Sequence, residues 1–361
     1  MKNPFTPSFG APPPLLVGRG DLLDLFEDAL DEGPGSPGYA TVYTGARGVG
    51  KTVMLNAAED LARAAGYAVI SETASPGFLQ RITTSHMPAL LPKTRRKVQA
   101  ASLGVVGGFE LEQSTPAMQI LRTMVEQVTL STPVLITVDE LQAGALGELR
   151  DLSVVLQHSI REGRNFAFCG AGLPSALDEL LNDKGVTFFR RADRHTLGVV
   201  GLQSVAAAFE SVISENGRTI GTDVAQAAAE ATGGYPYMIQ LVGYRAWRQH
   251  ADRIAITLDD VNAGAEQANR RIGTLVLEPA LSDLSAVDRT FLLHMATDKG
   301  PSRMSDIAAR MNTDANYASQ YRLRLIAAGL IEPAGHGRVR FVLPHVREWL
   351  REHAAFDTIQ L

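Results

Sequence analysis

The chain has 361 residues, of which 45% are hydrophobic and 20% charged, and its formal net charge is −5. This is a globular composition with apolar material for about two or three domains. The small negative charge excludes a general affinity for polyanions, so any nucleic-acid contact needs a local basic face.

Cysteine and hydropathy patterns indicate the compartment. The single cysteine, Cys169, can form neither an internal disulfide nor a multi-thiol zinc site, which favours a reducing, cytoplasmic setting. Its apolar context, Phe166–Cys169, predicts a buried thiol. No apolar run has the length of a signal peptide or a membrane span, so we expect no export and no membrane partner. The Pro-rich start is typical of an extended arm.

The first two hundred residues alternate between short apolar runs and helical patterns. The expected strands are Tyr39–Tyr43, Tyr67–Glu72, Pro133–Val138, Phe166–Gly170 and His195–Val200. The clearest expected helices are Asp21–Leu30, Val53–Ala65 and Gly147–Arg161. This alternation predicts an α/β fold with a largely parallel sheet and helices on both faces. The connection between the second and third strands is far longer than a usual loop, and we interpret residues 75–115 as an insertion.

The strand signals fade after residue 201. Helices are expected at Leu202–Glu215, Asp223–Thr232, Tyr237–Ala251 and from Asp259 onward, which predicts an all-helical domain. The last segment fits a winged helix-turn-helix. Its expected helices are Ala286–Ala296, Met304–Arg310 and Asn316–Ala328, and its wing strands are Leu330–Glu332 and Arg338–Leu343. The predicted domains are therefore 1–201, 202–280 and 281–361.

One motif predicts a phosphate site. It matches G-x-x-x-x-G-K-[ST] and consists of Gly45, Ala46, Arg47, Gly48, Val49, Gly50, Lys51 and Thr52. The glycines let successive backbone N–H groups turn toward phosphate oxygens. Lys51 supplies a positive charge for the β- and γ-phosphates, and Thr52 supplies a hydroxyl ligand for Mg²⁺. The helix expected to start at Val53 points its positive end at the same anion.

An acidic pair follows the third expected strand. Asp139 and Glu140 come directly after Pro133–Val138, and a buried parallel strand delivers such residues to the ligand-binding edge of its sheet. Asp139 can hold Mg²⁺, and Glu140 can polarise the water that attacks the γ-phosphate. The acidic pair also disfavours a GTPase, in which a Gln commonly orients that water. The cofactors that these motifs predict are ATP and Mg²⁺.

Taken together, these motifs resemble the AAA+/STAND group of P-loop ATPases, especially the origin-recognition-like and archaeal-type ATPases with a C-terminal winged helix. The resemblance covers most of residues 15–350. It implies that Val17, Gly18 and Arg19 contact the nucleotide base, although Gly20 stands where the family pattern has Glu. It also implies that Tyr235 and Pro236, in Gly233-Gly234-Tyr235-Pro236, close a lid over the base. The alternative is an ordinary helix start in each place.

The same resemblance places an arginine finger near the fifth strand. The candidates are Arg190, Arg191 and Arg194, any of which could reach a γ-phosphate in a neighbouring subunit of a homo-oligomer. Ion pairs with Asp193 are the alternative for these side chains. One departure concerns the end of the fourth strand, where the family has a polar sensor residue and this chain has Cys169-Gly170-Ala171-Gly172. This departure predicts slow hydrolysis.

The winged segment offers a face for double-stranded DNA. The candidate contacts to base edges and phosphates are Asn316, Tyr317, Gln320, Arg322, Arg324, Arg338 and Arg340. Nearby acids such as Asp298 and Glu332 offset much of this charge, so docking of a protein partner stays open as the alternative. The most basic stretch, Lys93–Lys97, fits a solvated loop better than a nucleic-acid site.

Two hypotheses follow. The first is an ATPase that converts ATP to ADP and phosphate and couples its nucleotide state to a DNA-binding winged helix. The second is a slowly hydrolysing, nucleotide-gated switch or scaffold whose winged helix docks a protein partner.

Overall fold

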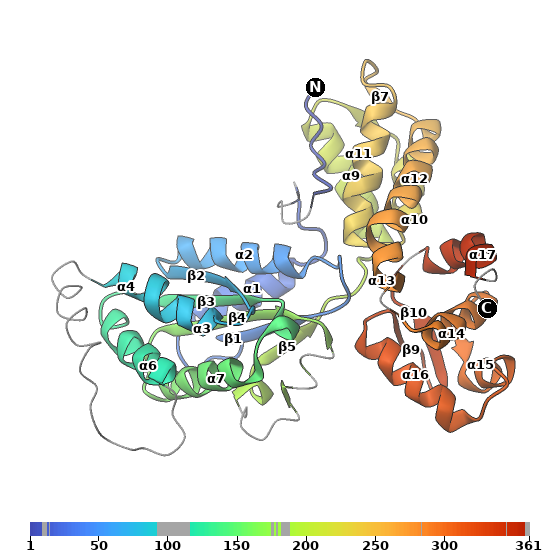
Figure 1. Ribbon diagram of the computed structural model, residues 1–361. Coiled ribbons are helices and arrows are strands. Elements are labelled where there is room, and N and C mark those ends of the chain that lie inside the picture. Colours follow the sequence, from blue (N-terminus) through green and yellow to red (C-terminus); the bar gives the residue numbers. More distant parts are fainter. Residues whose placement is uncertain are drawn as a thin grey trace. The chain divides into compact units, whose positions relative to one another are not determined.

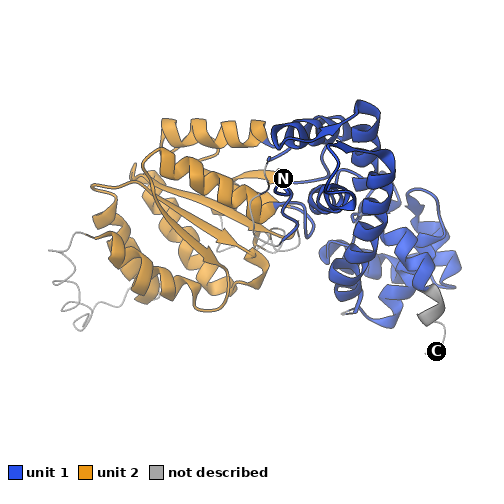
Figure 2. Cartoon of the chain, turned by 90° about the horizontal axis from the view of Figure 1, so that it is seen from above, with its two compact units in different colours: residues 1–19, 45–50, 197–361 blue, residues 20–44, 51–196 orange. Residues whose placement is uncertain are grey.

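The computed structural model describes residues 1–8, 13, 15–91, 116–174, 177, 180, 181, 188–282, 284–343 and 345–357. These residues form two compact units, shown in Figure 2. Unit 1 contains residues 1–19, 45–50 and 197–361, and unit 2 contains residues 20–44 and 51–196. The division of the chain into three domains stays a prediction.

Unit 2 is built on a five-stranded parallel sheet, as the strand–helix alternation predicted. Its strand order is β2-β3-β4-β1-β5. The strands are β1 (Ala40–Thr44), β2 (Ala68–Thr73), β3 (Val134–Asp139), β4 (Phe166–Gly172) and β5 (Asp193–Thr196). The central strand β4 is buried along its whole length, including Cys169, which confirms that thiol's predicted burial. The fifth strand begins two residues before the predicted His195–Val200 and overlaps it only at His195 and Thr196, because it pairs with β1 only through residues 193–196.

Helices cover both faces of this sheet, with α2 on one face and α6 and α7 on the other (Figure 1). The helical segments of unit 2 are α1 (Gly20–Glu32), α2 (Lys51–Ala64), α3 (Phe78–Arg81), η1 (Ile82–His86), α4 (Met87–Leu90), α6 (Pro116–Val128), η2 (Leu141–Ala143), α7 (Leu146–Arg161) and η3 (Phe188–Arg190). One apolar cluster joins Ile136 and Phe168 of the sheet to Leu121 of α6 and Leu152 of α7. Of the insertion predicted at 75–115, residues 92–115 lie outside the described residues, and so does Lys93–Lys97.

Unit 1 contains a group of helices, of which the first four pack around one core. They are α9 (Leu202–Glu215), α10 (Thr222–Thr232), α11 (Pro236–Gln249), α12 (Leu258–Ile272), η4 (Gly273–Leu277) and α13 (Glu278–Ser282). Phe209, Ala229, Trp247 and Val261 share this core with Phe5 from the N-terminal segment. The region was predicted to be all-helical, and that detail was wrong. Two short strands, β6 (Thr219–Ile220) and β7 (Ala255–Ile256), pair in parallel, and Arg218 before β6 donates to the carbonyls of Ile254 and His250.

The C-terminal part of unit 1 combines helices with a three-stranded antiparallel sheet. Its elements are α14 (Ala286–Ala296), β8 (Ser302–Arg303), α15 (Met304–Arg310), α16 (Ala315–Ala327), β9 (Ile331–Pro333), β10 (Arg338–Phe341) and α17 (Val346–Asp357), and the strand order is β8-β10-β9. The capping box of Ser285 and Asp288 begins α14, and Asp314 caps α16. Strand β8 and helix α17 were not predicted.

Among the helices that the structure describes, none combines the length and the apolar character needed to cross a membrane.

Candidate nucleotide site

The predicted phosphate loop runs between β1 and α2. Residues 45–50 form this connection, and α2 begins at Lys51, two residues before the predicted start, so Lys51, Thr52 and Val53 all lie in its first turn. Gly48 has a φ of 75°, a conformation that favours glycine. A Cβ at Gly48 would also collide with the Tyr235 hydroxyl. The loop therefore needs glycine there, and its backbone suits an anion held by N–H groups at a helix start.

The first turn of α2 is joined to the end of β3. The Thr52 hydroxyl donates a hydrogen bond of 2.6 Å to the Asp139 carboxylate, although the two residues are 87 positions apart in the chain. Lys51, next to Thr52, is buried with 7% of its surface exposed. A hydroxyl and a carboxylate in contact are hard oxygen ligands, the kind that Mg²⁺ prefers. These two side chains therefore fit the metal that the sequence predicted.

Glu140 begins the turn that follows β3. Its backbone is in the left-handed region (φ 55°, ψ 46°), and its N–H donates to Asp139 Oδ1 at 2.8 Å. Its carboxylate is exposed and accepts a hydrogen bond from Gln142 Nε2. Gln142 Oε1 in turn accepts from the backbone N–H of Leu173 at 3.0 Å. No sequence pattern pointed to Gln142, because its contact with Leu173 depends on how β3 and β4 pair.

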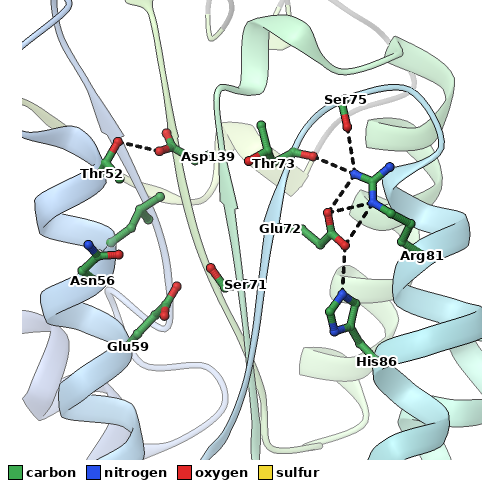
Figure 3. A pocket seen from close by; sticks show the side chains of 11 residues that line it. Thr52, Asn56, Glu59, Ser71, Glu72, Thr73, Ser75, Arg81, His86 and Asp139 are labelled. Carbon is green, nitrogen blue, oxygen red and sulfur yellow. Dashed lines mark hydrogen bonds and ion pairs between the residues drawn. The ribbon is translucent and has the colours of Figure 1, made fainter. Parts of the chain in front are cut away.

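A polar pocket of about 560 Å³ adjoins Thr52 and Asp139 (Figure 3). Its lining residues are Thr52, Leu55, Asn56, Glu59, Ser71, Glu72, Thr73, Ser75, Arg81, His86 and Asp139. Figure 3 shows Thr52 and Asp139 turned toward each other across the pocket from the Glu72–Arg81–His86 group. All of these residues belong to unit 2.

The far wall of this pocket is an ion-pair network that the sequence did not predict. The Glu72 carboxylate accepts hydrogen bonds from Arg81 Nη2 at 2.8 Å and from His86 Nε2 at 2.9 Å. Arg81 also donates to Ser75 Oγ and to the Thr73 carbonyl. Burial works against ionisation of Glu72, but the bonds from Arg81 and His86 outweigh it and hold the pKa of Glu72 below its usual range. This carboxylate is therefore a fixed negative charge at neutral pH.

Three segments of unit 1 gather around residues 197–200. Arg19 Nη2 donates to the Gly198 carbonyl, and Val200 N donates to the Gly234 carbonyl at 2.7 Å. The Tyr235 hydroxyl donates to the Arg47 carbonyl in the phosphate loop at 2.5 Å, and Pro236 starts α11. The segment around Gly18 and Arg19, the phosphate loop and the Gly234–Pro236 segment thus meet in one place. Val17 is half-buried against the helical core.

The arginine-finger candidates lie at the surface of unit 2. Arg190, Arg191 and Arg194 are all exposed. Arg190 Nε donates to the Leu181 carbonyl at 2.8 Å, while Asp193 lies 3.1 Å from His195 Nε2. The structure therefore shows Asp193 against a histidine, whereas the sequence had suggested an arginine partner. Which arginine would act in trans stays a prediction.

The DNA-contact candidates lie on α16 and β10. Asn316, Tyr317, Gln320 and Arg324 are exposed on α16, where Arg322 is half-buried. Two of the candidate cations face carboxylates: Arg324 lies 2.9 Å from Asp288, and Arg340 lies 2.6 Å from Glu332. Arg338 is half-buried on β10. These ion pairs reduce the net charge that the face can offer to phosphates.

Comparisons with known proteins agree with this geometry. Residues 15–165 match the AAA ATPase domain family, and residues 275–350 match a domain of unknown function (DUF8462). No curated protein matches the sequence. The region that matches the AAA ATPase domain family contains both the phosphate loop and the Asp139–Glu140 pair.

Three of the similar solved structures illustrate the likeness to this chain. The Walker-type ATPase PABY2304 of Pyrococcus abyssi has a TM-score of 0.66 at 14% identity, covering 93% of this chain and 96% of that one. The ORC2 protein of Aeropyrum pernix, solved with ADPNP and ADP, has a TM-score of 0.62 at 14% identity, covering 98% of each chain. Cdc6p of Pyrobaculum aerophilum has a TM-score of 0.51 at 15% identity, covering 98% and 97%. At these identities the likeness establishes the fold.

Proposed function

We propose that this chain, whose residues 15–165 form an AAA+ P-loop ATPase domain with an origin-recognition-like fold, binds ATP and Mg²⁺ and hydrolyses ATP to ADP and phosphate. The observation that carries the proposal is the 2.6 Å hydrogen bond between Thr52 and Asp139. It joins the phosphate-loop motif to the acidic motif, so the two patterns form one site. If the Gly-rich motif were a coincidence, no hydrogen bond between it and the end of β3 would be expected.

Each residue has a distinct part in the proposed reaction. The backbone of residues 45–52 and the Lys51 ammonium hold the phosphates, and Thr52 and Asp139 hold Mg²⁺. The metal, when bound, neutralises charge that develops on the phosphate oxygens. Glu140 accepts a proton from water as the water oxygen bonds to the γ-phosphorus. The bond from that phosphorus to the β–γ bridging oxygen breaks, which leaves ADP and inorganic phosphate.

The segments gathered around residues 197–200 supply the remaining contacts in this proposal. Val17, Gly18 and Arg19 on one side, and Tyr235 and Pro236 on the other, border the base. An exposed arginine among Arg190, Arg191 and Arg194 serves a neighbouring copy in a homo-oligomer. We also propose that the protein works in a reducing, cytoplasmic setting.

The test of the catalytic part is a pair of substitutions. Glu140→Gln should retain ATP and lose turnover by at least about 100-fold, because it removes the proton acceptor and keeps the shape of the side chain. Lys51→Ala should lose ATP binding itself. Phosphate release and binding of a fluorescent ATP analogue are measured for both. Turnover of Glu140→Gln at the parent rate would refute the role of Glu140.

For the C-terminal part we propose a winged helix-turn-helix that binds double-stranded DNA. In this arrangement α15 and α16 form the helix-turn-helix, and β9 and β10 form the wing. The helix α16 presents Asn316, Tyr317 and Gln320 on its exposed side, and such side chains can read base edges. A gel shift with duplex DNA at low and high salt tests this proposal. The absence of any shift at low salt would reject it.

Docking of a protein partner is the second candidate, and the same face supports it. Leu323 is 62% exposed and Tyr317 is 39% exposed on α16, while Arg324 and Arg340 already face carboxylates. Exposed apolar side chains beside neutralised charges suit a protein surface better than a phosphate backbone. In this case the chain is a nucleotide-gated switch with little turnover, and ATP hydrolysis is low with and without DNA.

A further inference from the structure

The carboxyl end of β4 is too tightly packed to take a larger side chain without a shift of its neighbours. A Cβ on Gly170 would lie 2.9 Å from the Phe168 ring and 3.1 Å from Leu141 Cδ1. A Cβ on Gly172 would lie 3.0 Å from Leu141 Cβ and 3.2 Å from Gln142 Oε1. Phe168 and the turn η2 therefore crowd the place where a polar side chain on β4 would stand. This explains why β4 reads Cys169-Gly170-Ala171-Gly172 at that point.

The carboxamide of Gln142 takes up that place instead. Its Oε1 accepts from the Leu173 N–H directly after β4, at 3.0 Å, and its Nε2 donates to the Glu140 carboxylate. One end of the amide is thus fixed by backbone, and the other end holds the exposed carboxylate. The left-handed backbone of Glu140 turns the chain so that Gln142 can reach back to it.

The strand order locates this amide with respect to the chemistry. In the order β2-β3-β4-β1-β5, β4 lies between β3, which carries Asp139, and β1, which leads into the phosphate loop. A polar group at the carboxyl end of β4 therefore lies between the acidic motif that follows β3 and the end of β1, where the phosphate loop begins. In the hydrolysis proposed above, we place the attacking water in this same region.

We propose that Gln142 is a positioning residue that holds the Glu140 carboxylate at the carboxyl end of β4, in the orientation that accepts a proton from the attacking water. The proposal rests on the ATP hydrolysis proposed above. Gln142 supplies from the turn after β3 the polar group that β4 lacks. A residue fixed at both ends of its amide keeps the base in one place at low entropic cost.

Two substitutions separate positioning of Glu140 from simple anchoring of β4. Gln142→Glu keeps an oxygen that can accept from Leu173 N–H, but it replaces the donor with a second carboxylate beside Glu140. Gln142→Leu removes both bonds. In the full chain, both variants should lower kcat for ATP by about 10- to 100-fold, because each removes a hydrogen bond to a charged group, while KM stays within about twofold. The matched control is Gln226→Ala, which removes an amide–carboxylate bond to Glu230 on the exposed side of α10.

A parent-like or higher kcat in Gln142→Glu would overturn the proposal, because anchoring of β4 alone explains that result. A fall in kcat matched by an equal loss of ATP binding would also overturn it. In the Glu140→Gln background, Gln142→Leu should cause no further loss, and a further loss of similar size would contradict positioning. Absence of turnover in the parent chain rejects the proposed ATPase itself, whereas normal parent turnover with parent-like Gln142 variants rejects only the role of Gln142.

Discussion

The contact between Thr52 and Asp139 allows a quantitative test of the metal site. Thr52→Val keeps the shape of the side chain and removes its hydroxyl, and Thr52→Ser keeps the hydroxyl and removes a methyl group. For the contact of the hydroxyl with a bound Mg²⁺ we use the range of a hydrogen bond to a charged group, about 1.5–3 kcal/mol. Thr52 is exposed, so solvent screening favours the lower end of that range, about 1.5 kcal/mol. About 1.4 kcal/mol corresponds to a tenfold change in affinity, and we therefore expect Thr52→Val to weaken binding of Mg²⁺–ATP about tenfold.

The assay is a titration of a fluorescent ATP analogue, run once with Mg²⁺ and once with a chelator. Because the hydroxyl is proposed as a metal ligand, the weakening should occur only with Mg²⁺, and Thr52→Ser should bind like the parent in both conditions. A role of the Thr52 hydroxyl as a metal ligand is refuted if Thr52→Val binds Mg²⁺–ATP as tightly as Thr52→Ser. An equally large loss in the chelator would also refute this role, because the hydroxyl would then act on the loop and not on the metal.

Two further predictions concern stability. Glu72→Gln should lower the free energy of unfolding by about 1 kcal/mol at neutral pH, through loss of the ionic bond from Arg81. Because the folded-state pKa of Glu72 is depressed, this contribution is present above the unfolded-state pKa and is lost as pH falls through the folded-state pKa. Denaturant titrations at several pH values should show parent and variant converging in acid, and a constant gap would contradict the assignment. Arg218→Met should cost about 2–4 kcal/mol, since Arg218 is 1% exposed and its Nη1 donates to the Trp247 carbonyl at 2.6 Å. Tryptophan fluorescence during unfolding measures this loss, and the exposed Arg253→Met, which should stay near the parent, is the control.

The central sheet was predictable because its strands are buried. β3 is buried from Val134 to Val138, and its sequence is a short, mostly apolar run, which is the pattern that predicts a buried strand. The edge strand β5 was misplaced because it pairs on one side only and alternates between half-buried and exposed residues. The apolar residues that suggested a strand, Leu197 and Val200, are buried in unit 1. The strands β6 and β7 have two residues each, too few for any period to show.

Some residues of the candidate site were likewise predictable from the sequence, and others were not. Lys51, Thr52 and Asp139 belong to local patterns with fixed spacing, and such patterns can be read from a sequence. Gln142 and the Glu72–Arg81–His86 network depend on which strands are neighbours and on the turn after β3. A single sequence does not contain that information locally. The missing polar residue on β4 was visible in the sequence, but its explanation required the packing of η2 against Gly170 and Gly172.

Because Cys169 is buried, the reactivity of its thiol can report unfolding of the chain. This thiol lies at the middle of β4 with no exposed surface, and burial raises its pKa, so the folded protein keeps it as an unreactive thiol. Since the sequence contains no other cysteine, the rate of alkylation measures how often the sheet opens. A cysteine introduced at an exposed position of α16 could also be labelled selectively while Cys169 stays in place. Fluorescent probes for nucleotide-dependent motion can therefore be attached to the otherwise native sequence.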